Sequence, residues 1–269
     1  MASFVEAYFA PKKEIPRRVY LTASTVIGVP IIVAWSGLTY GGVVRPEFLP
    51  APHAVLVTGA EMLADGSLLK HTWASVSVIF TGFFLASVLA VPLGIFMGSF
   101  KIVEAAVEPV VNFIRYLPVS ALIPLLILWI GIGFEEKVAV IFIGTFFQQL
   151  MLIADVSASV SSDLLDTSYT LGANRRKVVT KVLIPATLPG VTDTLRITMG
   201  WAWTYLVVAE LVAANNGLGY MILNAMRGLF TDVIFLGILV IGLLGLLTDQ
   251  LVKALRHMLL PWAGSSNVS

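Results

Sequence analysis

Long apolar runs alternate with short polar segments along most of this chain. Six of the runs approach or exceed the length of about 20 residues that a helix needs to cross the hydrocarbon core of a bilayer. We place these runs at residues 19–38, 72–100, 107–132, 138–154, 188–213 and 233–255. The pattern predicts an all-α, polytopic membrane protein with about six transmembrane helices.

The third run is the least regular. Pro118 and Pro124 interrupt it, and Gly131 and Gly133 end it, so we expect a broken helix or a helix followed by a re-entrant turn. The polar segment between the first two runs contains several Gly and Pro residues and is predicted to carry one short surface helix near 54–63.

Composition supports a membrane location. Hydrophobic residues make up 58% of the chain and charged residues 12%, whereas soluble proteins carry about 25% charged residues. The spans fill most of the 269 residues, so we expect one transmembrane domain over 19–256, with an N-terminal segment at 1–18 and a C-terminal tail at 257–269. The chain has no Cys and only three scattered His residues, so we expect neither disulfides nor a metal site.

The distribution of positive charge predicts the orientation. If both termini lie in the cytoplasm, 13 of the 17 Lys and Arg residues fall on the inside, Arg115 and Arg196 among them, and only four on the outside. Cytoplasmic loops of membrane proteins carry such an excess. We therefore predict a multi-pass protein with both termini in the cytoplasm.

The longest inside loop, 156–185, has the pattern of two short helices joined by a turn. Residues 161–163 are good helix-start residues, and Asn174 can cap the second helix. Gly172 can adopt the positive φ of a helix end, and Pro185 is expected to end the second helix. Such a knob suits docking into a groove on another protein. The alternative is an ordinary loop whose basic residues touch anionic lipid headgroups.

Residues 166–174, with Leu183-Ile184-Pro185 after them, resemble the "EAA" loop of binding-protein-dependent ABC importer permeases. In that family the loop forms a coupling helix that sits in a cleft of the ATPase subunit. Asp166 takes the glutamate position, and Thr167 and Ser168 take the two alanine positions, where they keep the size but not the polarity. The resemblance implies an ATPase-coupling role for Asp166, Thr167, Ser168, Leu171, Gly172, Ala173, Asn174 and Pro185.

Further motifs over about residues 70 to 260 resemble the nitrate/sulfonate/taurine branch of these permeases. They are Glu108-Pro109, 115–118, 121–125, 128–133, and 209–214 with 217–219. The resemblance implies the type I importer (MetI-like) permease fold, a homodimer in the cell inner membrane, two cytoplasmic ATPase subunits, and a periplasmic or surface-tethered solute-binding protein. Membrane lipid is the other expected partner, and nucleic acid is not expected.

The chain itself is expected to be a transport subunit and not an enzyme. It lacks the G-x-x-x-x-G-K-[ST] phosphate-binding loop, so ATP and Mg would be bound by the partner chains, and this chain is expected to bind no cofactor. It also lacks a nucleophile–base pair that would suggest catalysis.

Four residues within the spans are candidates for the translocation path: Gln148, Gln149, Trp203 and Glu210. Adjacent residues of a helix point about 100° apart, so at most one glutamine should face a central path while the other bonds a neighbouring helix. For Glu210 a hydrogen bond between helices is the favoured alternative, and Trp203 can equally be packed or lipid-facing.

The resulting prediction is a permease subunit for a small polar solute, with a nitrate-, sulfonate-, taurine- or bicarbonate-type anion favoured. One alternative is the same importer carrying a neutral or cationic nitrogen compound, such as a pyrimidine precursor or a guanidine-like molecule. The other is an ATP-independent secondary transporter, which would be expected to carry more intramembrane ionisable groups than this chain has.

Overall fold

The computed structural model describes residues 16–212 and 214–263, and helices are the only regular secondary structure in those two segments. The prediction of an all-α fold is thus confirmed. Most of the predicted segment 1–18 and part of the tail 257–269 lie outside the described residues. The helices are α2 (Arg17–Tyr40), α3 (Pro52–Ala64), α4 (Ser67–Ser99), α5 (Lys101–Ile114), α6 (Val119–Ile130), α7 (Phe134–Ala158), α8 (Ser162–Thr170), α9 (Arg175–Val178), the π-helix η1 (Val179–Leu183), α10 (Ile184–Val212), α11 (Leu218–Arg227) and α12 (Thr231–Leu259).

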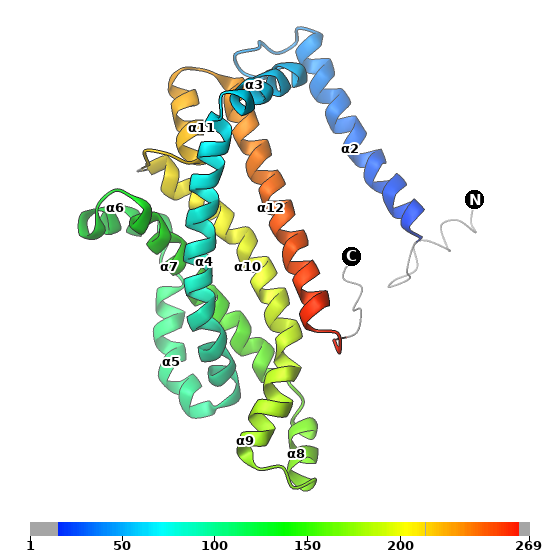
Figure 1. Cartoon of the computed structure of the whole chain (residues 1–269), viewed down its shortest axis with the longest axis vertical. Coiled ribbons are helices and arrows are strands. Elements are labelled where there is room, and N and C mark those ends of the chain that lie inside the picture. Colours follow the sequence, from blue (N-terminus) through cyan, green and yellow to red (C-terminus); the bar gives the residue numbers. More distant parts are fainter. Residues whose placement is uncertain (1–15, 213, 264–269) are drawn as a thin grey trace.

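Four helices of the described chain are long and apolar enough to cross a membrane: α2, α4, α7 and α12. The pair α5 and α6 makes a fifth span if it is counted as one. Helix α10 is more polar but, at 29 residues, as long as α12, and its inclusion gives the predicted number of about six. The short helix expected near 54–63 is α3, which lies at the end of the molecule opposite α8 and α9 (Figure 1).

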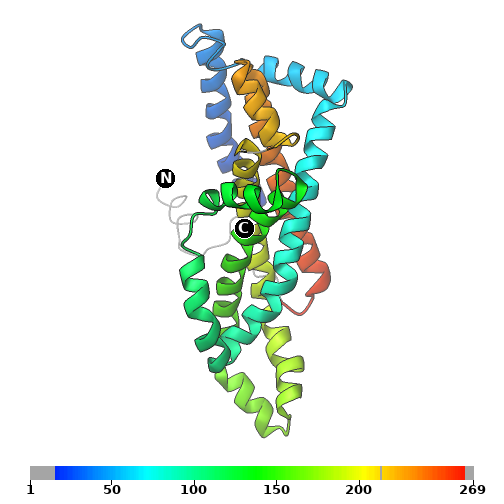
Figure 2. The ribbon, with the colours of Figure 1, turned by 90° about the vertical axis from the view of Figure 1, so that its left-hand side faces the viewer.

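The third predicted span is a broken helix, as expected. Helices α5 and α6 are bent by 91° at the break, so that α5 follows the long axis of the molecule while α6 lies across it (Figures 1 and 2). Pro118 precedes α6 in an extended conformation, and a proline also disfavours the helical conformation in the residue before it. The chain therefore leaves the helical path at Arg115–Pro118 and turns sharply.

The core is built on a close crossing of α4 and α7. A Cβ atom added to Gly98 would lie 2.0 Å from the backbone oxygen of Ala154, and one added to Gly94 would lie 2.8 Å from the Ile153 side chain. Small residues let two helix backbones approach this closely. Ser157 Oγ then donates a hydrogen bond across the crossing to the Ile95 carbonyl at 3.0 Å.

Helix α2 stands apart from the other long helices (Figure 1). None of its apolar window is buried, and its described contacts gather near its end, where Trp35 Nε1 donates to the Pro50 carbonyl at 2.9 Å and the Trp35 ring stacks on Phe235. An apolar helix with this much free surface is typical of a segment solvated by lipid or by a neighbouring subunit.

Candidate functional site

The segment 156–185 forms a helical protrusion at one end of the molecule (Figure 1). Helix α8 ends in a turn at Gly172, which has a φ of +84°. Asn174 Oδ1 then accepts a hydrogen bond of 3.0 Å from the Lys177 backbone N–H and caps α9. The predicted helix–turn–helix, its glycine turn and its asparagine cap are confirmed.

The prediction that Pro185 ends the second helix is wrong. Helix α9, η1 and α10 follow one another without interruption, so the protrusion continues directly into a long helix. A proline clashes with the carbonyl four residues earlier in an α-helix. The hydrogen bonds of the preceding π-helical turn reach five residues and widen the turn, which gives the Pro185 ring the space it needs.

The tip of the protrusion is open to its surroundings. Leu171 is 82% exposed, and Asp166, Thr167, Gly172 and Asn174 are exposed as well, whereas Ser168, Ala173 and Pro185 are half-buried. An apolar side chain held this far out has no neighbour within the chain to bury it. Farther from the tip, Val178 of α9 and Leu183 of η1 are buried.

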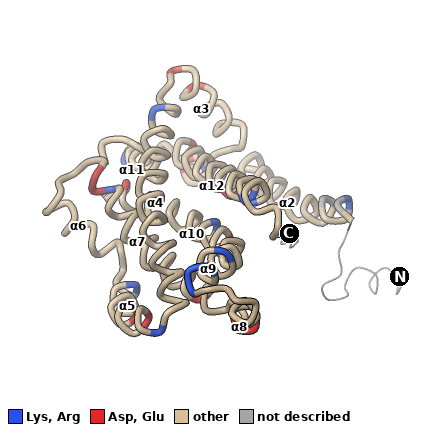
Figure 3. Tube along the Cα trace, turned by 60° about the horizontal axis from the view of Figure 1, so that its bottom comes forward, with Lys and Arg blue, Asp and Glu red and all other residues tan. Residues whose placement is uncertain are grey.

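A cation–π contact ties the base of the protrusion to the rest of the molecule. The Arg175 guanidinium lies 5.1 Å from the centroid of the Phe100 ring, and Phe100 joins α4 to α5. Three basic residues follow one another on α9, where the trace is coloured blue in Figure 3. The protrusion is thus connected to the rest of the molecule at two places, the start of α10 and the α4–α5 corner.

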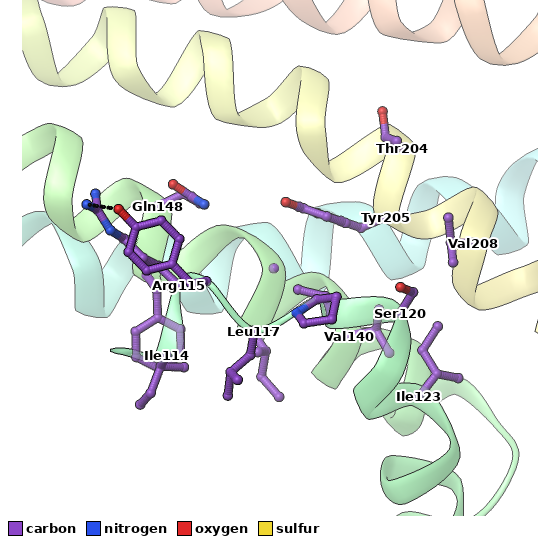
Figure 4. Close-up of a pocket in the computed structure, with 16 residues that line it drawn as sticks. Ile114, Arg115, Leu117, Ser120, Ile123, Val140, Gln148, Thr204, Tyr205 and Val208 are labelled. Carbon is purple, nitrogen blue, oxygen red and sulfur yellow. Dashed lines mark hydrogen bonds between the residues drawn. The ribbon is translucent and has the colours of Figure 1, made fainter. Parts of the chain in front are cut away.

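The second feature is a cavity of about 410 Å³ at the break between α5 and α6. Helices α7 and α10 complete its wall (Figure 4). Most of the lining is apolar, and its polar side chains are Arg115, Tyr116, Ser120, Gln148, Thr204 and Tyr205.

The two glutamines separate as the helical geometry predicts. Gln148 lines the cavity, whereas Gln149 is fully buried and outside the lining. The expected bond from Gln149 to a neighbouring helix is absent in the described chain, where neither its Nε2 nor its Oε1 has a partner.

Glu210 stands outside the cavity lining and joins three helices. Ser75 Oγ of α4 donates to Glu210 Oε1 at 2.8 Å, and the Gly219 N–H of α11 donates to Oε2 at 2.7 Å. The Leu218 N–H in turn donates to Ser75 Oγ at 2.8 Å. This geometry matches the helix-to-helix alternative, in which the carboxylate fixes the turn between α10 and α11 against α4.

Trp203 also lies outside the cavity. It is 4% exposed, and its Nε1 donates to Thr248 Oγ1 of α12 at 3.2 Å. Its ring forms part of the core between α4, α7 and α10, because its position on α10 points it at α12 and away from the cavity wall that carries Thr204 and Tyr205.

Arg115 is a cavity residue that was not among the candidates named from the sequence. It was counted with the inside loops, but it follows the last residue of α5 and lines the cavity, about 20 Å along the helix from Lys101. If Arg115 is left out of the inside count, most of the Lys and Arg residues still fall on the predicted inside. The sequence signal that could have found it was its position as a lone charge in an apolar run, three residues before Pro118, where the helix breaks.

Long apolar helices around a cavity at a broken span, with a helical protrusion at one end, define a multi-pass membrane transport protein. The model of the family described as "Binding-protein-dependent transport system inner membrane component" matches residues 90–259. The chain belongs to this family, and it is therefore a transport subunit of the ABC importer permease class.

Named relatives lie in its nitrate/sulfonate/taurine branch. The chain is 34% identical to the taurine transport system permease protein TauC of Escherichia coli, covering 92% of this chain and 91% of that protein. It is 33% identical to the putative aliphatic sulfonates transport permease protein SsuC of Bacillus subtilis, covering 87% and 85%. It is also 31% identical to the formylaminopyrimidine transport permease protein ThiX of Halalkalibacterium halodurans, covering 88% and 94%.

The fold agrees with this family. An inward-facing structure of the MetNI methionine ABC transporter matches 71% of this chain and 97% of the compared chain with a TM-score of 0.59 at 22% identity. The predicted MetI-like permease fold is confirmed, and the bent α5–α6 pair and the protrusion belong to a chain of that architecture.

Proposed function

We propose that two copies of this chain form the translocation path of an ATP-driven importer for a sulfonate-type anion, with taurine as the first candidate. Two ATPase subunits bind on the side of α8 and α9, which is the cytoplasmic side, and a solute-binding protein delivers the anion to the opposite end. The observation that carries the proposal is the exposed Leu171 at the tip of a protrusion that continues into α10.

The proposed coupling works as a lever. The tip around Leu171 and Gly172 sits in a cleft of the ATPase subunit, so closure of the two ATPases on ATP moves α8 and α9. Because η1 joins α9 to α10 without a break, and because Arg175 contacts Phe100, that movement reaches α10, α4 and α5. Helices α5 and α10 contribute to the cavity lining, and α4 packs against α7, which also lines it. The cavity then opens alternately to the two sides of the membrane.

The ATPase activity is assigned to the partner chains because this sequence has no phosphate-binding loop. Family membership disfavours the ATP-independent transporter, since the matched family is described as a component of binding-protein-dependent transport systems. The basic side chains of α9 remain available for lipid headgroups at the edge of this interface.

The solute class is supported by the taurine and aliphatic sulfonate relatives. A second candidate is a neutral pyrimidine precursor, because the formylaminopyrimidine relative is similar over almost the same share of the chain. Uptake assays with taurine and with a formylaminopyrimidine, using the complex with its own binding protein, separate the two.

Substitutions at Gly172 test the coupling. Gly172 has a positive φ, and an added Cβ would meet no atom within 4 Å, so Asn, which tolerates this conformation, should keep the turn. Gly172→Pro should abolish both uptake and solute-stimulated ATPase activity while the permease remains in the membrane, since proline fixes φ near −65°. A bulky charge, Ala173→Glu, should do the same.

Gly172→Asn is the matched control, and it should stay close to wild type. Full transport and full stimulated ATPase activity in both Gly172→Pro and Ala173→Glu would rule out the coupling role of the protrusion.

A further inference from the structure

Arg115 is a half-buried cation in the lining of the cavity at the α5–α6 break, and it has no carboxylate partner among the described residues. One of its terminal nitrogens donates to the Tyr116 hydroxyl at 3.2 Å, and its guanidinium carbon lies 4.9 Å from the centroid of that ring. Its Nε is buried and has no acceptor in the described chain. A guanidinium has five N–H donors, so the contact with Tyr116 leaves most of them unused.

The position of Arg115 makes this unusual. It lies about 20 Å along α5 from Lys101, within a bent pair that is otherwise apolar enough to span a membrane. An ionisable side chain at membrane depth normally faces a partner, a substrate or a water-filled path. The cavity at the α5–α6 break is the space that Arg115 faces.

The rest of the cavity complements an anion. Gln148 and Tyr205 contribute an amide and a hydroxyl, and in the view of Figure 4 the Tyr205 hydroxyl points toward the Gln148 amide. Val119 and Ser120 bring the first turn of α6 to the wall, and the first amides of a helix have no acceptor within it. No Asp or Glu is found among the lining residues.

The apolar part of the lining and the volume fit a small organic solute. About 410 Å³ lies within the range of about 300–1,000 Å³ that small-molecule sites occupy. Ile143, Phe147 and Val208 contribute apolar surface to the lining, against which a short alkyl chain can lie.

We propose that Arg115, with Gln148 and Tyr205, forms an anion subsite inside the permease that binds the sulfonate group during translocation. The inference rests on the proposed function, because it adds a binding step in this chain to the selection made by the binding protein. The fork of the guanidinium donates two parallel hydrogen bonds to two sulfonate oxygens, and the amide and the hydroxyl can satisfy the third.

The test uses the complete importer, with its ATPase subunits and its binding protein, in proteoliposomes. ATP-dependent uptake of radiolabelled taurine is measured for wild type, Arg115→Gln, Arg115→Lys and Gln148→Glu, together with binding-protein-stimulated ATPase activity. Arg227→Gln, on the exposed end of α11, is the matched control for the loss of an arginine charge.

Loss of a charge-assisted hydrogen bond predicts that Arg115→Gln reduces taurine uptake about 10-fold or more. Gln148→Glu, on α7, should also reduce taurine uptake, because a carboxylate there would repel the sulfonate and pair with Arg115. Taurine uptake by Arg115→Lys should lie between that of wild type and that of Arg115→Gln, since an ammonium keeps the charge but not the forked geometry of the guanidinium. Stimulated ATPase activity and Arg227→Gln should stay at the wild-type level.

Three outcomes overturn the subsite. Unchanged uptake in Arg115→Gln, with an active wild type, rejects it and leaves the importer function standing. Parallel loss of uptake and stimulated ATPase activity in Arg115→Gln, Arg115→Lys and Gln148→Glu assigns these residues to folding or coupling instead. A wild-type complex that takes up a formylaminopyrimidine and not taurine rejects both the sulfonate solute and the subsite.

Discussion

The contacts of Glu210 predict that its loss destabilises the end of the molecule where α10, α11 and α4 meet. The side chain is fully buried, and Glu210→Ala removes the acceptor of the Ser75 hydroxyl and of the Gly219 N–H. It also empties a space around which the turn is built, because a Cβ at Gly217 would lie 2.1 Å from Glu210 Oε1.

The magnitude follows from the two donors left without an acceptor. A buried donor that loses its partner costs about 1–3 kcal/mol, so the two together predict a loss of about 2–6 kcal/mol. For a chain of this size, 1 kcal/mol shifts the unfolding temperature by about 2–4 °C. Glu210→Ala should therefore unfold at least about 4 °C below wild type. Glu210→Gln keeps the shape and one acceptor, so its shift should be smaller.

Thermal unfolding of the detergent-purified permease, followed by intrinsic fluorescence or by the fraction that remains monodisperse, measures this shift. Glu61→Ala is the matched control, since Glu61 is an exposed residue of α3 and its loss should leave the unfolding temperature unchanged. An unfolding temperature of Glu210→Ala equal to that of the Glu61 control would refute the structural role.

Three further predictions concern the contacts that hold the helices together. Gly98→Ala should abolish a stable fold, because the added Cβ would lie 2.0 Å from the α7 backbone. The loss of a monodisperse peak on size exclusion measures this. Gly28→Ala is the control and should elute like wild type, because its Cβ meets nothing within 4 Å. Asp193→Asn should lower the unfolding free energy by about 1 kcal/mol, because it breaks the 2.6 Å ion pair with Arg256 that joins α10 to α12; unfolding at wild-type temperature would contradict this. Arg175→Ala should weaken stimulation of the ATPase by solute without removing the permease from the membrane, and an unaltered stimulation would exclude the contact with Phe100 from the coupling route.

Features of the fold set by neighbouring residues could be predicted from the sequence. Gly172 and Asn174 act on the backbone within three residues of themselves, so the turn and the cap of the protrusion followed from residue type and spacing. The break of the third span followed from Pro118 in the same way. The apolar runs located the long helices, because their length is set by the membrane and not by the packing.

Features set by packing could not be predicted. Pro185 appeared to be a helix end, and only the wider π-helical turn before it permits continuation. Arg115 lies at the cavity because α6 is set at 91° to α5, an angle that no local pattern specifies. Whether Gln148 or Gln149 faces the cavity depended on the rotation of α7, and Trp203 was placed by its hydrogen bond to Thr248.

We expect the tip of the α8–α9 protrusion to contact an ATPase subunit in the cytoplasm. The chain contains no cysteine, so Leu171→Cys introduces a single reactive thiol at the exposed tip of the protrusion. Site-specific cross-linking from this thiol in the intact complex is predicted to yield one product containing the ATPase subunit, with an efficiency that changes when ATP is bound. A membrane-impermeant maleimide added only to the outside of intact cells should not modify this thiol. Its modification there, with no cross-link to an ATPase, would contradict both the cytoplasmic location of the tip and its contact with the ATPase subunit.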